Sequence, residues 1–241
     1  GPYSRHNKFS SKIIIGADGA RSFTAKHFNF PAIKNFIYCY EAELTDLNVA
    51  NKTLVDVFLD NKLFPGFFGW VVPVSNYGAR IGFGVKDPSR LLKTRDIFLS
   101  KPEINQLIDR GKKVREFFAP IPISQRSVTQ KGKVILVGDA AGQVKATTGG
   151  GVIFGSMCAT KAAESTANHI FDGKVLNYDN VWRAQYGHVL TGHSVLRALM
   201  DNVDNRLTDI SFGVASALGF NRLFESFGDM DFILKPLTAK V

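Results

Sequence analysis

One stretch, residues 134–163, constrains the fold of this chain more than any other. It reads VILVGDAAGQVKATTGGGVIFGSMCATKAA. Its first four residues are apolar and mostly β-branched, which is typical of a short buried strand. A loop of small residues follows, and then three consecutive glycines precede an apolar segment that predicts a helix. The stretch therefore predicts a strand, a small-residue loop and a helix that opens on glycines.

A helix that opens on glycines presents unpaired N–H groups and the positive end of its dipole to whatever lies in front of it. Asp139 lies one loop earlier, where a carboxylate can accept hydrogen bonds from the hydroxyl groups of a ligand. Together these features suggest a ligand that carries both hydroxyl groups and an electron-rich group. A flavin dinucleotide has both.

The sequence GDAAG at residues 138–142, followed by GxG at 149–151, resembles the second flavin-binding motif of the flavoprotein hydroxylase-like superfamily. The resemblance implies that FAD is bound, that the Asp contacts its ribitol or pyrophosphate, and that the glycine-opened helix faces the flavin ring. The family usually has a proline where this chain has Ala146, which makes the loop less rigid here. The cofactor-binding residues implied by this motif are Gly138, Asp139, Ala140, Gly142, Gly149, Gly150, Gly151 and Val152.

A second motif lies earlier in the chain. Residues 13–22, IIIGADGARS, are similar to the strand–GADGxxS motif with which the same superfamily closes against its cofactor. This match implies that Asp18 and Gly19 also contribute to the cofactor site. Either motif alone could be a generic strand-to-helix turn, but the two in this order, separated by a strand-rich insert, are specific.

The insert, residues 33–85, is rich in β-branched and aromatic residues and predicts an antiparallel sheet with a hairpin across residues 75–78. Within it, residues 67–73 (FFGWVVP) resemble the YxWxFP segment of the geranylgeranyl reductase family, which lines an isoprenoid tunnel beside the flavin. The resemblance implies substrate contacts by Phe68, Trp70 and Pro73. Phe68 replaces the family's tyrosine, so any role of the phenol hydroxyl is absent. The alternative is a strand that packs Trp70 into a core; Pro73 favours an edge or bulged position.

The fold class expected from these patterns is mixed α and β: a partial, Rossmann-like FAD-binding domain with an inserted antiparallel substrate sheet and a C-terminal helical region. The expected parts are residues 1–31 and 129–175 for the FAD-binding domain, 32–128 for the sheet with a helical excursion near 87–110, and 176–241 for the helical region. Within the last part, residues 178–200 and 203–234 are expected to be helical.

Composition limits the partners. The 241 residues carry a formal net charge of +9, with no run of basic residues interleaved with aromatic ones, so a nucleic-acid partner is not expected. The two cysteines, Cys39 and Cys158, fit no metal spacing and read as small buried apolar residues. No signal peptide or membrane span is visible, so the expected setting is cytoplasmic, with peripheral contact to a membrane if the substrate is a lipid.

The expected first motif of such flavoproteins, G-x-G-x-x-G, does not occur in this sequence. We interpret the chain as the C-terminal portion of a longer protein, with Gly1-Pro2 as vector-derived residues. The missing half, or a partner chain that supplies it, is then needed to complete the cofactor site.

The activity implied by the resemblance is an FAD-dependent oxidoreductase that saturates C=C bonds of geranylgeranyl chains on lipids, with hydride from flavin N5. No Asp, Glu, His or Cys is placed by its spacing as a proton donor, so no catalytic residue is assigned. Two alternatives stay open: a flavin monooxygenase or halogenase acting on an aromatic substrate, and a non-catalytic flavoprotein relic or partner subunit.

Overall fold

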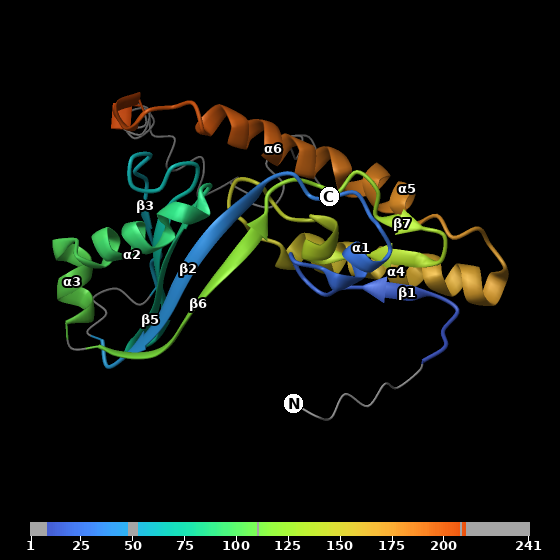
Figure 1. Cartoon of the computed structure of the whole chain (residues 1–241), viewed down its shortest axis with the longest axis horizontal. Helices are drawn as coiled ribbons and strands as arrows, with labels where there is room; N and C mark the ends of the chain where they lie inside the picture. Colours follow the sequence, from blue (N-terminus) through green and yellow to red (C-terminus); the bar gives the residue numbers. More distant parts are fainter. Residues whose placement is uncertain (1–8, 48–52, 110, 208, 211–241) are drawn as a thin grey trace.

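The computed structural model describes residues 9–47, 53–109, 111–207 and 209–210, and contains two sheets (Figure 1). The smaller sheet has the strand order β1 (Ile14–Gly16), β8 (Val134–Leu136), β7 (Gln130–Lys131). The larger sheet has the order β3 (Asp56–Phe58), β4 (Gly69–Ser75), β5 (Gly78–Val85), β2 (Phe36–Thr45), β6 (Lys112–Pro122). In the smaller sheet β1 and β8 are parallel, whereas every pairing in the larger sheet is antiparallel. The expected mixed fold with an inserted antiparallel sheet is confirmed.

The long strands β2 and β6 connect the two parts of the molecule. They pair from Phe36↔Pro122 beside the smaller sheet to Thr45↔Lys112 at the far end, with one register shift near Glu43 (Figure 1). Because side chains alternate along a strand, the residues of β2 and β6 that point to the same side form one continuous face. This face runs from the end beside the smaller sheet to the far end of the larger sheet.

One face of the larger sheet is covered by helices α2 (Leu91–Leu99) and α3 (Pro102–Ile108). A 3-10 turn, η1 (Pro88–Arg90), leads into α2, and the Asp87 side chain caps it by accepting a hydrogen bond from the backbone of Ser89. The core on this face is made of residues from the strands, the two helices and the β3–β4 connection, including Tyr40, Ala42, Leu44, Phe64, Val71, Ala79, Ile81, Phe83, Val85, Phe98 and Ile104. The larger sheet, which corresponds to the expected substrate sheet, therefore has a packed hydrophobic core of its own on this face.

The smaller sheet is covered on both faces. The long helix α4 (Val152–Asp172) packs on one face together with α5 (Tyr178–Trp182) and α6 (His188–Met200), and the short helix α1 (Phe23–His27) packs on the other. Ile135 of β8 points toward α4, while Val134 and Leu136 point toward α1. A strand that is buried on both faces has to be apolar throughout, which explains the run of residues 134–137.

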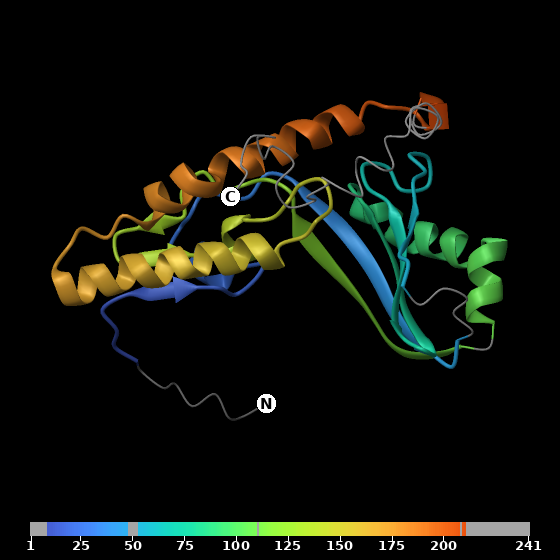
Figure 2. The same cartoon turned by 180° about the vertical axis from the view of Figure 1, so that it is seen from behind.

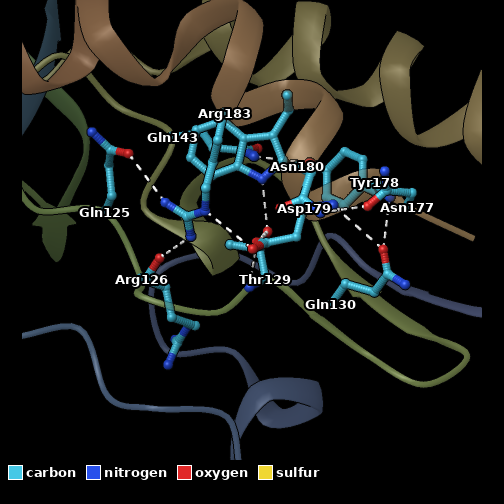
Figure 3. A network of polar contacts seen from close by, with 11 residues as sticks. Gln125, Arg126, Thr129, Gln130, Gln143, Asn177, Tyr178, Asp179, Asn180 and Arg183 are labelled. Carbon is cyan, nitrogen blue, oxygen red and sulfur yellow. Dashed lines mark hydrogen bonds and ion pairs between the residues drawn. The ribbon is translucent and has the colours of Figure 1, made fainter.

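Between α5 and α6 the chain makes one π turn, η3 (Arg183–Gly187), and the three segments form one helical rod that crosses toward the larger sheet (Figures 1 and 2). A polar network fixes the start of this rod (Figure 3). The carboxylate of Asp179 accepts hydrogen bonds from the backbone N–H of Thr129, at 2.8 Å, and from its hydroxyl group. The Trp182 indole donates to the same Thr129 oxygen at 2.7 Å, and Arg183 stacks over the indole.

Several expectations from the sequence can be compared with this fold. The hairpin across residues 75–78 is confirmed, as are the helical excursion and the helix over 178–200. Pro73 lies past the end of the β3 pairing and next to a register shift, as expected for an edge or bulged position. Most of the segment 203–234 lies outside the described residues. None of the helices in the described part of the chain has the length and apolarity needed to cross a bilayer.

Candidate flavin site

The two sequence motifs meet at one groove. Because β1 and β8 are parallel neighbours, their carboxyl ends lie at the same edge of the smaller sheet. The loop after β1 and the loop after β8 therefore face each other there, next to the first turn of α4. The groove has a volume of about 600 Å³ and is lined by Ala17, Gly19, Ile121, Val137, Gly138, Asp139, Gly149, Gly151, Val152, Gly155, Ser156 and Ala159.

The N-terminus of α4 opens directly onto this groove. Gly149 has a φ of +73°, a conformation that favours glycine, and Gly151 is the N-cap residue of the helix. No side chain caps the helix, so its first N–H groups and the positive end of its dipole are directed at the groove. This end of a 21-residue helix is suited to an electron-rich or anionic group of a ligand.

Asp139 is the one titratable residue among those that line the groove. Its side chain is half-buried, and its carboxylate accepts no hydrogen bond from any residue in the described ranges. Burial raises its pKa above the ordinary value of an aspartate. A carboxylate held in a groove without protein donors is available to ligand hydroxyl groups.

The groove fits the flavin dinucleotide implied by the motifs. A Cβ atom at Gly151 would lie 2.8 Å from the Asp139 Oδ1 atom, so only glycine leaves room for the carboxylate. Gly138, with a φ of +66°, has open space where a Cβ would be. Glycines on both sides of a carboxylate let a flat, hydroxyl-bearing ligand approach the backbone closely. Gly138, Asp139 and the first turn of α4 are the residues that would hold it.

Of the ten predicted cofactor residues, four do not line the groove. Asp18 caps the start of α1 instead: its carboxylate accepts hydrogen bonds from the Ser22 hydroxyl at 2.6 Å and from the Thr24 backbone at 2.8 Å. Burial alone would raise the pKa of Asp18, but these hydrogen bonds hold it below its ordinary value. The other three are Ala140, which is fully buried, Gly142, which turns the loop at a φ of +70°, and Gly150, which faces Lys145.

The structure also places residues at or beside the groove that the motifs did not identify. The buried Gln143 side chain accepts a hydrogen bond from the Gly138 N–H at 2.8 Å. It also donates one to the Tyr178 hydroxyl at 2.8 Å (Figure 3). Gln143 therefore connects the loop after β8 to α5. Along α4, Gly155 and Ala159 follow Gly151 at intervals of four residues, a helical periodicity that could have been recognised in the sequence.

The three predicted substrate residues divide between the two faces of the larger sheet. The rings of Phe67 and Phe68 stack at 4.2 Å, and Trp70 packs edge-on against both. Trp70 is on the face without helices α2 and α3, whereas Pro73 alternates with it and shares the side of Val71, which belongs to the core beneath those helices. The face without α2 and α3, called the open face below, therefore contains Phe68 and Trp70. Pro73 lies on the opposite face, next to the register shift in β4.

The open face also contains one of the two cysteines. Cys39 is buried there, and this burial, together with the nearby charge of Glu41, raises the pKa of its thiol to about 12. Cys158 is buried in α4, and burial raises the pKa of its thiol to about 12 as well. The expectation that both cysteines are small buried residues is confirmed.

Comparison with known proteins agrees with the geometry of the groove. Residues 3–170 match the model of the FAD binding domain family. The chain is 24% identical over 243 residues to a digeranylgeranylglycerophospholipid reductase of Methanocaldococcus jannaschii, covering 95% of this chain and 60% of that protein. It is 32% identical over 170 residues to a geranylgeranyl diphosphate reductase of Rhodobacter capsulatus, covering 69% of this chain and 42% of that protein. The chain thus spans roughly half the length of these curated relatives.

Solved structures show the same fold. A geranylgeranyl bacteriochlorophyll reductase-like protein from Thermoplasma acidophilum matches 80% of this chain and 51% of its own, with a TM-score of 0.66 at 19% identity. A flavin-dependent brominase matches 92% of this chain and 58% of its own, with a TM-score of 0.70 at 12% identity. At such identities the likeness concerns the fold alone. Since the family model covers more than half of the sequence, this chain belongs to the FAD binding domain family, and FAD is its cofactor.

Proposed function

We propose that this chain forms the substrate sheet and part of the flavin site of a reductase that saturates C=C bonds in the geranylgeranyl chains of lipids. The observation that carries the proposal is that the groove with Asp139 and the glycine-opened α4 shares Ile121 with the open, aromatic face of the larger sheet. Two relatives of similar sequence bear reductase names that specify geranylgeranyl substrates.

In this proposal each part of the site has a separate task. Asp139 hydrogen bonds to hydroxyl groups of the cofactor, and the first N–H groups of α4 stabilise negative charge on its ring. Reduced FAD, when bound, supplies the hydride. The open sheet face holds the alkene beside the groove and keeps water away from it, because an unactivated C=C bond reacts only when it is well positioned.

The proposal includes further residues that complete the cofactor site, either from the same polypeptide or from a partner chain. β1 forms an edge of the smaller sheet, and its apolar residues Ile14 and Ile15 are 40% and 45% exposed. A parallel strand with two exposed apolar residues is suited to pair with another strand. Peripheral contact with a membrane, from which a lipid substrate would be drawn, belongs to the same proposal.

The experiment is a two-step assay of the purified chain. Absorbance spectra are recorded before and after incubation with FAD and removal of free cofactor. The chain is then supplied with a geranylgeranyl lipid and dithionite, and product mass is measured. Retained flavin and a gain of two hydrogens per reduced bond would support the proposal.

The same assay discriminates the alternatives. A hydroxylated or halogenated aromatic product, with oxygen consumed, would contradict the proposal and favour a monooxygenase or halogenase. Absence of bound flavin even after addition of the N-terminal region of a full-length relative would favour a non-catalytic subunit. The matched control is the Asp139→Ala variant, which should lose flavin while keeping the circular dichroism spectrum of the native chain.

A further inference from the structure

A second pocket lies where α6 passes over the end of β2 that is beside the smaller sheet (Figures 1 and 2). It has a volume of about 390 Å³ and shares no lining residue with the flavin groove. Three cations, Lys34, Lys86 and Arg197, line it together with one carboxylate, Asp201. The described residues around this pocket, called the basic pocket below, therefore have a surplus of two positive charges.

Arg197 is a buried cation in the wall of the basic pocket, and only 5% of its surface is exposed. Its Nε atom donates a hydrogen bond to Asp201 at 3.0 Å, and its Nη1 atom donates one to the Thr147 carbonyl at 3.3 Å. The guanidinium lies over the Phe67 ring, 5.0 Å from its centroid. Within the part of the chain that the structure describes, its Nη2 group donates to no acceptor. Because a guanidinium has five N–H groups, Arg197 keeps donors for a ligand.

The other two cations differ in how they are paired. Lys86 forms an ion pair with Asp201, so this one carboxylate serves both Lys86 and Arg197. Lys34 is exposed and has no ion-pair partner among the residues that the structure describes. A phosphate monoester at pH 7 carries up to about two negative charges and has three strong acceptor oxygens. It therefore matches both the charge surplus and the donors of the basic pocket.

The basic pocket adjoins the apolar cluster on the open face. Ile123 lines the pocket and packs in one buried cluster with Ile37, Cys39 and Phe67. Ile121, two residues earlier in the chain, lines the flavin groove. At about 3.3 Å per residue, these two isoleucines are roughly 7 Å apart along the chain. One ligand can therefore have a phosphate in the basic pocket and an apolar chain that extends toward the groove.

We infer that the basic pocket binds the phosphate group at the polar end of an isoprenoid substrate, through Arg197, Lys86 and Lys34. In the free chain Asp201 is the counter-ion of Arg197 and Lys86, and a bound phosphate competes with it for both cations. The inference rests on the proposed function, because it assigns the phosphate to an isoprenoid rather than to a free anion.

The test is isothermal titration calorimetry of the purified chain with geranyl monophosphate, inorganic phosphate and geraniol. The first probe combines the phosphate and the isoprenoid chain, which the other two carry separately. We expect geranyl monophosphate to bind at least about tenfold more tightly than either of the others, because it gains both charged hydrogen bonds and apolar contact. Equal affinity for inorganic phosphate would overturn the assignment to an isoprenoid, and equal affinity for geraniol would overturn the phosphate site itself.

Two variants with opposite expected effects locate the binding. Lys34→Gln should weaken geranyl monophosphate binding by about threefold, as expected for an exposed cation. Asp201→Asn should strengthen it by about fivefold, because the competing carboxylate is removed. A merely structural role of Asp201 would not give such a gain.

The matched control is Lys93→Gln, which makes the same charge change at an exposed position of α2 outside the basic pocket and should leave the affinity at its native value. Circular dichroism verifies that each variant is folded. Native affinity in Lys34→Gln, or unchanged or weaker binding in Asp201→Asn, would overturn the inference. These results are distinguishable from failure of the proposed function, because they are measured without flavin, whereas the proposed function is read from flavin absorbance and product mass.

Discussion

Gly151 and Asp139 are in such close contact that a Cβ atom at Gly151 would lie 2.8 Å from the Asp139 Oδ1 atom. The φ of Gly151 is −108°, which any residue can adopt, so the backbone does not require glycine at this position. Glycine is required here because the Asp139 carboxylate leaves no room for a Cβ atom. A substitution at Gly151 therefore tests the cofactor site without straining the start of α4.

We expect Gly151→Ala to weaken FAD binding by about tenfold or more, because the methyl group must displace the Asp139 carboxylate, which we propose as a cofactor contact. The measurement is a fluorescence titration of FAD, with circular dichroism to verify folding. Gly187→Ala is the matched control, since a Cβ there has ordinary contacts at 3.5 Å and Gly187 does not line the groove. Equal affinity of the native chain and Gly151→Ala would show that Asp139 does not contact FAD.

A second prediction concerns Asp139 itself. Because burial raises its pKa, its ionised form is disfavoured by folding. Its contribution to stability is therefore present below the ordinary pKa of 3.8 and is lost as the pH rises through the raised value in the folded chain. We expect Asp139→Asn to increase the Tm of the cofactor-free chain at pH 7 by a few degrees at most, at about 2–4 °C per kcal/mol.

The same substitution should weaken FAD binding, so stability and cofactor affinity change in opposite directions. The check is a series of thermal unfolding curves from pH 4 to pH 7, in which the advantage of Asp139→Asn grows with pH. An advantage that is constant over this range would contradict the assigned cause.

A third prediction concerns Asp179, whose pKa shift has the opposite sign. Burial by itself would raise the pKa of Asp179, but hydrogen bonds from Thr129 and the ion pair with Arg183 lower it. Its contribution to stability is therefore present above its ordinary pKa of 3.8 and is lost as the pH falls through the lower value. We expect Asp179→Asn to reduce the free energy of unfolding by about 2 kcal/mol at pH 7.

Urea unfolding at several pH values measures this effect. The difference between the native chain and Asp179→Asn should shrink as the pH falls below 3.8 and through the lower pKa of the folded carboxylate. Asp109→Asn, at an exposed position after α3, should change the free energy of unfolding by less than about 0.5 kcal/mol. A pH-independent loss for Asp179→Asn would indicate packing rather than charge.

A fourth prediction concerns the two thiols. With pKa values of about 12, Cys39 and Cys158 are ionised to roughly one part in ten thousand at pH 8. We expect neither thiol to react rapidly with Ellman's reagent in the folded chain, and both to react after unfolding in guanidinium chloride. Rapid reaction of one thiol in the folded chain would contradict its burial.

Local patterns were sufficient to predict much of this protein. The apolar run at residues 134–137, the small-residue loop and the three glycines each describe a local backbone requirement, and the structure has the strand, turn and helix in those places. The same holds for the hairpin at residues 75–78 and for the bulge beside Pro73. These features depend on neighbours in sequence, which a pattern can represent.

The assignment of roles within the motifs was less complete. Asp18 and Asp139 are each followed by small residues, and the two sequence motifs predict the same role, cofactor binding, for both. In the structure Ser22 and Thr24 donate hydrogen bonds to Asp18, which caps the start of α1, whereas Asp139, which lines the groove, has no such donor among the residues that the structure describes. The difference depends on which donors the folded chain places nearby.

The sequence by itself determined the strand–loop–helix units, the cofactor family and the position of the inserted sheet, because these follow from local conformational preference and from motifs with fixed spacing. Tertiary structure alone decided that Ile121 joins the flavin groove and that Trp70 reaches Glu41 across Gly82. Glu41 and Trp70 are 29 residues apart in the sequence, and strand register, which is set by the packing of a whole sheet face, determines which side chains meet.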